Sequence, residues 1–199
     1  MALKKSKFGA SFQSALGRFF SVIPLTANQI TVFALLFAAA GFYASYLGLP
    51  FHALLLFLFA AAVDAIDGAV ARFRKEVSDK GAYIDGIIDR LVEFLFIISF
   101  FFFLPGNAVV FAGACLITIL FFGTCMTSFA TAYAEHRHVA DSKKISSQPG
   151  ILPRAERLIA LFASFILLAY GSAWAYLLLP LIALLCIVTF FQRFLYFSS

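Results

Sequence analysis

Six stretches of this 199-residue chain are candidates for helices that cross a lipid bilayer. A membrane-spanning helix needs about 20 mostly apolar residues, because the bilayer offers its backbone no hydrogen-bond partners. The stretches cover roughly residues 30–47, 51–72, 82–104, 108–133, 155–170 and 173–197. The composition, 63% hydrophobic and 13% charged, also excludes an ordinary soluble domain. We predict an all-α integral membrane protein with six transmembrane helices.

Residues 1–25 are predicted to form a cytoplasmic interfacial helix ahead of these spans. Phe8, Phe12, Leu16 and Phe19 recur at three- and four-residue intervals with polar residues between them. This spacing is typical of an amphipathic helix lying on a membrane surface. Residues 26–199 would then form one six-helix membrane domain.

The positive charges predict the orientation of the chain in the cell membrane. The connections near residues 48–50, 105–107 and 171–172 hold no charge, whereas the lysines and arginines gather on the other side. By the positive-inside rule, both termini and the loop after the second span are cytoplasmic. The net charge of +5 therefore indicates attraction to anionic membrane lipids, and we expect no nucleic-acid partner.

Four aspartates, Asp64, Asp67, Asp85 and Asp89, interrupt the second and third apolar stretches. Residues three or four apart share a helix face, and the two antiparallel helices are joined by a short loop, so one carboxylate cluster is expected at the cytoplasmic surface. Neighbouring carboxylates cannot all stay ionised without cations. Oxygen ligands favour Mg²⁺ or Mn²⁺, with room for two ions, and such ions commonly serve phosphate chemistry.

Two other interpretations of the aspartates stay open at this point. The carboxylates could form ion pairs with nearby cations such as Arg72 and Arg90, as intramembrane charges sometimes do. They could instead line an ion pathway, although the outer half of the chain offers no charged relay.

The run DxxDGxxAR at residues 64–72, followed after eight residues by GxxxDxxxD at 81–89, resembles the signature of the CDP-alcohol phosphatidyltransferases. All eight defined positions match. The six spans, the amphipathic start and a Thr-x-Asn-Gln entry at residues 26–29 resemble the family as well. Ala27 departs from the pattern, since relatives often have proline there.

The resemblance implies metal-dependent transfer of a phosphatidyl-type group from a CDP-linked lipid, CDP-diacylglycerol or its ether-lipid equivalent, to a polar alcohol, with release of CMP. The four aspartates would hold the metal ions, and Asp89 would also be the catalytic base. A homodimer is implied too. The residues implied to bind the CDP-lipid are Ala27, Asn28, Gln29, Ile30, Gly68, Ala71, Arg72, Ser78 and Gly81.

Arg154, Arg157 and Arg193 are the candidate acceptor-binding residues. Antiparallel fifth and sixth spans can bring them to one cytoplasmic pocket suited to an acceptor that carries a phosphate. These segments resemble the prokaryotic phosphatidylinositol-phosphate synthases, which implies inositol 1-phosphate as acceptor. Thr131 and Tyr133, however, stand where those synthases tend to have cations. Glycerol 3-phosphate, serine and inositol remain alternatives, and the arginines could merely snorkel to the interface.

Three wider alternatives also stay open. An intramembrane prenyltransferase would use aspartate-bound Mg²⁺ on a diphosphate, but two separated aspartate-rich motifs would be expected, and here there is one cluster. A divalent-cation carrier would use the same carboxylates without chemistry. The chain could also be the membrane part of a larger bifunctional enzyme.

Overall fold

The computed structural model describes residues 27–74 and 78–199, and all regular secondary structure in these ranges is helical. The interfacial helix predicted for residues 1–25 lies outside the described residues. The chain divides into two compact units, Met1–Ser99 and Phe100–Ser199.

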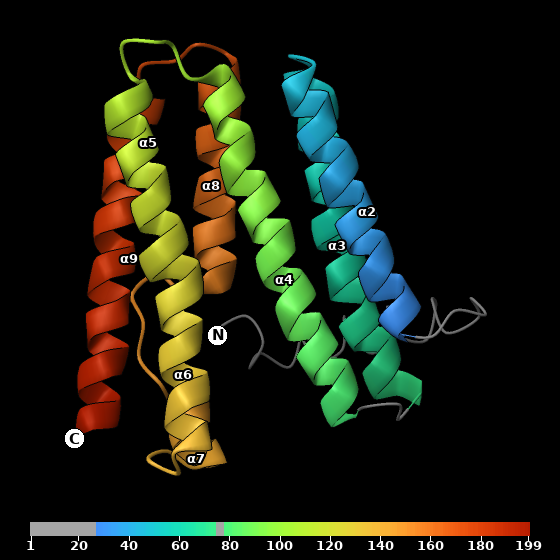
Figure 1. Cartoon of the computed structure of the whole chain (residues 1–199), viewed down its shortest axis with the longest axis vertical. Helices are drawn as coiled ribbons and strands as arrows, with labels where there is room; N and C mark the ends of the chain where they lie inside the picture. The colour runs from blue at the N-terminus through green and yellow to red at the C-terminus, as the bar shows by residue number, and fades with distance from the viewer. Residues whose placement is uncertain (1–26, 75–77) are drawn as a thin grey trace. The chain divides into compact units, whose positions relative to one another are not determined.

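The first unit contains α2 (Ala27–Tyr46), α3 (Pro50–Arg74) and α4 (Asp79–Ser99). α2 and α3 lie side by side as an antiparallel pair (Figure 1), and the turn between them places Gly48 at a φ of 70°, which glycine adopts without strain. The ring of Phe57 lies against Gly41 of α2 and, at 4.8 Å between centroids, against Phe96 of α4. Small buried residues therefore let these helices approach closely.

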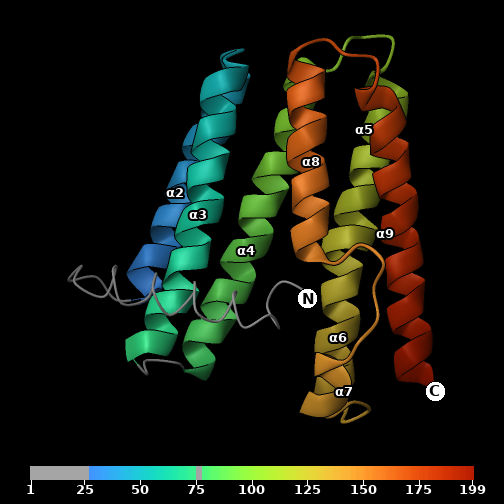
Figure 2. The same cartoon turned by 180° about the vertical axis from the view of Figure 1, so that it is seen from behind.

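The second unit begins with a 3₁₀ turn, Phe100–Phe103, and continues through α5 (Val109–Thr118), a π-helical segment (Ile119–Met126) and α6 (Thr127–His136) as one column. It ends with α7 (Ser142–Ser146), α8 (Arg154–Ala169) and α9 (Ala175–Ser198). α5 and α8 both pack on α9, as Figure 2 shows. Leu116, Leu161 and Leu179 are fully buried in this unit, and Phe165 meets the ring of Phe100 edge to face at 5.1 Å.

A helix is found over each of the six predicted stretches. Within residues 27–74 and 78–199, four helical segments are long and apolar enough to cross a membrane: Gln29–Tyr46, Pro50–Arg74, Val109–His136 and Ala175–Ser198. α4 is not among them because it carries several charges, and α8 is only 16 residues long. The all-helical membrane architecture is supported, while the count of six spans stays a prediction.

Candidate functional site

The two signature motifs meet in the first unit. Asp64 and Asp67 of α3 and Asp85 of α4 each offer a carboxylate oxygen, and these oxygens all lie within 4.8 Å of one another. The three-residue spacing on α3 puts its two aspartates on one face, as predicted. Asp67 is buried, with 4% of its surface exposed. The structure thus brings three of the four predicted metal ligands together.

The surroundings of Asp67 fit a cation. The Thr31 hydroxyl of α2 and the backbone N–H of Gly68 donate hydrogen bonds to its carboxylate. Its Oδ2 atom is nevertheless buried and has no hydrogen-bond partner in the described part of the chain. A buried carboxylate oxygen without a partner is costly, and a hard divalent cation satisfies it. Asp64, Asp67 and Asp85 therefore fit Mg²⁺ or Mn²⁺.

Thr31 was not among the predicted site residues. It lies within α2, four residues after the helix begins at Ala27, and it belongs to neither of the two aspartate motifs. Only the packing of α2 against α3 and α4 shows that its hydroxyl supports a site aspartate. A group that orients a metal ligand in this way tunes metal affinity without touching the ion.

Asp89 lies one turn beyond Asp85 on α4. It is not one of the three aspartates whose oxygens converge, although it is close enough to Asp67 for their charges to interact. It is buried, and its Oδ2 atom lies 3.3 Å from Nη1 of Arg90. The same nitrogen donates to the backbone carbonyl of Gly86 at 3.2 Å. One ion pair of the expected kind is thus present, between Asp89 and the adjacent Arg90.

Arg72 folds back over the helix that carries it. A Cβ atom placed on Gly68 would lie 3.3 Å from Nη1 and 3.6 Å from Nη2 of Arg72. Glycine at position 68 therefore lets the guanidinium rest against α3, one residue from Asp67. A positive group beside a cation-binding cluster is well placed for an anionic diphosphate.

The remaining predicted donor-binding residues lie at helix ends and along α3. Ser78 precedes α4, and its Oγ atom accepts a hydrogen bond from the backbone N–H of Gly81 at 3.1 Å, so it acts as a helix cap. Residues 27–30 form the first turn of α2, where Ile30 is buried and Gln29 is exposed. Ala71 lies on α3 between Gly68 and Arg72.

The three acceptor candidates all lie in the second unit. Arg154 begins α8, and Arg157, one turn on, is 4% exposed. The Cδ atom of Arg157 lies 3.0 Å from the point where a Cβ of Gly123 would stand. Arg193 of α9 donates from Nη1 to the backbone carbonyl of Thr127 at 3.2 Å and reaches Oγ1 of Thr131 at 3.5 Å.

The two positions that lack the expected cations differ in their surroundings. Thr131 lies beside Arg193 and donates a hydrogen bond to Oε1 of Gln148 at 2.7 Å. Tyr133 is 49% exposed and stacks on Phe129 at 5.2 Å. Of these two positions, Thr131 is therefore the one that contacts a candidate acceptor-binding residue, Arg193.

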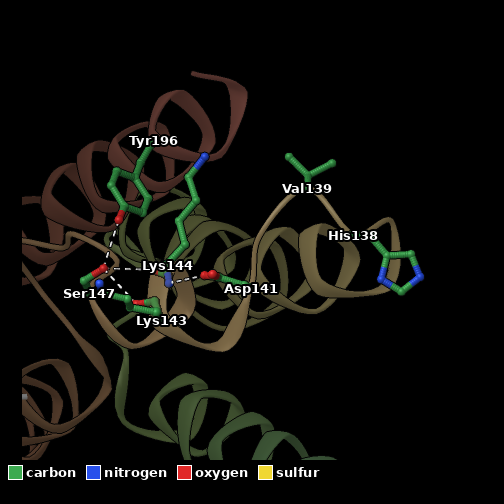
Figure 3. Close-up of a pocket in the computed structure, with 7 residues that line it drawn as sticks. All are labelled: His138, Val139, Asp141, Lys143, Lys144, Ser147 and Tyr196. Carbon is green, nitrogen blue, oxygen red and sulfur yellow. Dashed lines mark hydrogen bonds between the residues drawn. The ribbon is translucent and has the colours of Figure 1, made fainter.

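A separate open pocket lies where α7 meets the end of α9 (Figure 3). Ser147 Oγ and the Tyr196 hydroxyl are 3.0 Å apart, and Nζ of Lys144 lies 5.6 Å from the centre of the Tyr196 ring. The pocket contains none of the predicted site residues. Its lining residues are His138, Val139, Asp141, Lys143, Lys144, Ser147 and Tyr196.

The fold and the aspartate cluster together define a membrane protein with a candidate divalent-cation site beside an arginine. The family described as CDP-alcohol phosphatidyltransferase matches residues 24–191, and the chain belongs to this family. It is therefore an enzyme of phospholipid biosynthesis. The match contains both signature motifs, Arg154 and Arg157, and ends two residues before Arg193.

The chain is also similar in sequence to two named relatives. The archaetidylinositol phosphate synthase of Pyrococcus horikoshii is 29% identical over 178 residues, which are 89% of this chain and 86% of that protein. The bifunctional IPC transferase and DIPP synthase of Archaeoglobus fulgidus is 35% identical over 104 residues, or 52% of this chain. That matched region is only 20% of the Archaeoglobus protein.

The fold also resembles a solved membrane enzyme. The phosphatidylinositol phosphate synthase of Mycobacterium tuberculosis with CDP-DAG bound has a TM-score of 0.75 and 21% identity, and the match covers 94% of both chains. Its structure with manganese and citrate matches with the same TM-score and covers 94% of this chain and 89% of that one. At this identity the likeness concerns the fold.

Proposed function

We propose that this enzyme transfers a phosphatidyl-type group from a CDP-linked lipid to a polar alcohol and releases CMP. The observation that carries the proposal is the convergence of Asp64, Asp67 and Asp85 around a buried, unsatisfied Asp67 oxygen within the family signature. Together with Asp89, these residues would hold two Mg²⁺ or Mn²⁺ ions. The manganese complex of the mycobacterial synthase supports this choice of metal.

The residues of the first unit would bind the donor. Arg72, resting on Gly68, would pair with the diphosphate, and Ala71 and Gly81 would belong to the same donor site. Ser78 and residues 27–30 would complete the donor site. When bound, the divalent ions would neutralise the diphosphate oxygens and stabilise departing CMP.

Asp89 would act as the base of the transfer. The acceptor hydroxyl oxygen forms a bond to the phosphorus that carries the lipid, the bond from this phosphorus to the CMP oxygen breaks, and the hydroxyl proton passes to Asp89. A buried carboxylate one turn from the metal cluster suits this role, because it is shielded from bulk water. Its pair with Arg90 orients the carboxylate.

The proposed acceptor is inositol 1-phosphate, bound through Arg154, Arg157 and Arg193. The name of the Pyrococcus relative supports an inositol phosphate acceptor. Guanidinium groups bind phosphate oxygens in a bidentate manner, which suits an acceptor already carrying a phosphate. We further propose that both termini and the active site face the cytoplasm and that the enzyme is a homodimer.

Release of CMP by the purified enzyme tests the proposal. Protein in detergent is given Mg²⁺ or Mn²⁺ and CDP-diacylglycerol or its ether-lipid equivalent. The acceptors are inositol 1-phosphate, glycerol 3-phosphate, serine and inositol. We expect CMP release that is fastest with inositol 1-phosphate. Turnover of a prenyl diphosphate in place of the CDP-lipid, or Mn²⁺ flux into sealed vesicles without CMP release, would contradict it.

The variant Asp89→Asn tests separately whether Asp89 is the catalytic base. Asp89→Asn should lower the rate about 10²- to 10⁴-fold, the usual contribution of a general base, while Mn²⁺ still binds. Asp79→Asn, an exposed acid on the same helix, is the matched control and should retain activity. Wild-type turnover by Asp89→Asn would remove Asp89 from the mechanism.

A further inference from the structure

The segment 147–152, between α7 and α8, is tied along one face of α9. Ser147 is hydrogen-bonded to Tyr196, the N–H of Ile151 donates to Gln192 Oε1 at 3.1 Å, and the N–H of Leu152 donates to Thr189 Oγ1 at 3.0 Å. The α9 residues follow the three- and four-residue spacing of one helix face, which also carries Arg193. In Figures 1 and 2 this segment runs beside α9.

Gln148, within this segment, reaches Arg193 through Thr131. The Thr131 hydroxyl donates to Gln148 Oε1 at 2.7 Å, and Nη1 of Arg193 lies 3.5 Å from the same hydroxyl oxygen. A threonine hydroxyl has one proton and two lone pairs. That proton is shared between two acceptors, Gln148 Oε1 at 2.7 Å and the Thr127 carbonyl at 3.0 Å, and in either case the oxygen is left as an acceptor for the guanidinium.

We propose that Thr131 and Gln148 are positioning residues that fix the guanidinium of Arg193 for the acceptor's phosphate. This inference rests on the proposed role of Arg193 in acceptor binding. A long arginine side chain loses rotamer freedom when it binds, so holding it in advance improves affinity. The Thr131 hydroxyl, the Gln148 amide and the Thr127 carbonyl are neutral, so they orient the charge without cancelling it.

The geometry around Gly150 supports this arrangement. A Cβ atom on Gly150 would lie 3.1 Å from Thr189 Cγ2 and 3.8 Å from Arg193 Nη2. The backbone at Gly150 therefore lies against the guanidinium of Arg193. Thr131 stands at a position where the inositol-phosphate synthases tend to have a cation. In this chain the position adds no positive charge, and its hydroxyl instead contacts the guanidinium of Arg193.

The test compares two glutamines that each make one of the hydrogen bonds of the segment 147–152. Gln148 belongs to the relay, which we define as the hydrogen-bonded chain Gln148–Thr131–Arg193. Gln192 lies outside this relay and anchors the same segment to α9. Gln148→Ala should raise KM for inositol 1-phosphate about three- to tenfold, the scale of one lost hydrogen bond, with kcat and the KM for the CDP-lipid within about twofold of wild type. Gln192→Ala should leave all three values within about twofold of wild type.

Two further variants examine the relay itself. Thr131→Val removes the hydroxyl and should repeat the Gln148→Ala effect, whereas Thr131→Ser keeps the hydroxyl and should restore the wild-type KM. Gln148→Glu adds a negative charge near Arg193 that competes with the phosphate, so its KM should exceed that of Gln148→Ala.

Equal effects of Gln148→Ala and Gln192→Ala would overturn the inference, since segment anchoring alone would then explain both. A wild-type KM for Gln148→Ala, or a fall in kcat without a change in KM, would overturn it as well. Failure of the proposed function looks different. In that case the wild-type enzyme itself releases no CMP with a phosphorylated acceptor, and the positioning role falls together with the proposed acceptor.

Discussion

Replacing Gly68 with alanine should separate the stability of α3 from the activity of the enzyme. Glycine in a helix interior is less favourable than alanine by about 0.5–1 kcal/mol, because its unfolded chain is more flexible. Gly68 lies within α3, so Gly68→Ala should stabilise the helix by up to this amount. A change of that size corresponds to a rise of roughly 1–4 °C in the unfolding midpoint.

The added methyl group should nevertheless displace Arg72. It would stand 3.3 Å from Nη1, closer than the roughly 3.5–4.0 Å at which non-bonded atoms rest, and at an ordinary 3.6 Å from Nη2. The guanidinium is the end of a flexible, exposed side chain, so it can yield by a few tenths of an ångström at little cost to the fold. Because catalysis depends on the position of groups that hold the substrate, we expect kcat/KM to fall about tenfold.

The two effects are measured on the same preparation, by thermal unfolding in detergent and by CMP release. Gly86→Ala is the control for stability, because nothing lies within 4 Å of a Cβ atom at that position on α4. In the Arg72→Ala background, Gly68→Ala should cause no further loss of activity, since the group it displaces is gone. Additive losses in this double-mutant cycle, or unchanged activity of Gly68→Ala, would refute the reasoning.

Three further predictions concern the metal cluster and the second unit. Thr31→Val, which removes the hydrogen bond to Asp67, should weaken Mn²⁺ binding about 10- to 100-fold, while Thr31→Ser restores it; titration with Mn²⁺ followed by electron paramagnetic resonance would measure this. Chelation with EDTA should abolish CMP release, and Mg²⁺ or Mn²⁺ should restore it better than Zn²⁺, because the ligands are all oxygens; retained activity after chelation would contradict this expectation. Gly123→Ala should lower the unfolding midpoint, because its Cβ would lie 2.7 Å from Sγ of Cys186 and 3.0 Å from Cδ of Arg157, and an unchanged midpoint would show that this site relaxes.

The helices and the aspartate cluster could be predicted from the sequence because both depend on short-range periodicity. Apolar runs predicted a helix over each stretch, and the three-residue spacing of Asp64 and Asp67 placed them on one face. The role of Thr31 could not be predicted in this way, because it depends on how α2 packs on two later helices. The link from Arg193 to Gln148 likewise joins residues that are far apart in the sequence.

The proposed donor and acceptor arginines share one feature, a neighbouring glycine, and only the pair of Gly68 and Arg72 belongs to the signature motif. Arg72, Arg157 and Arg193 each lie against a position where a glycine leaves space, at Gly68, Gly123 and Gly150 respectively. Ordering a long arginine side chain costs conformational entropy. A glycine has no Cβ atom, so the arginine can rest against the backbone there and populates fewer side-chain conformations before substrate binds.

The effect of each Gly→Ala substitution should depend on which atoms the added methyl group contacts. At Gly68 the nearest atoms are the mobile end of Arg72, whereas at Gly123 they include the stem of Arg157, which is 4% exposed, and the buried Cys186. A flexible tip can move aside, but a packed stem can yield only if its neighbours move too. Gly68→Ala should therefore mainly lower activity, whereas Gly123→Ala should mainly lower the stability of the fold.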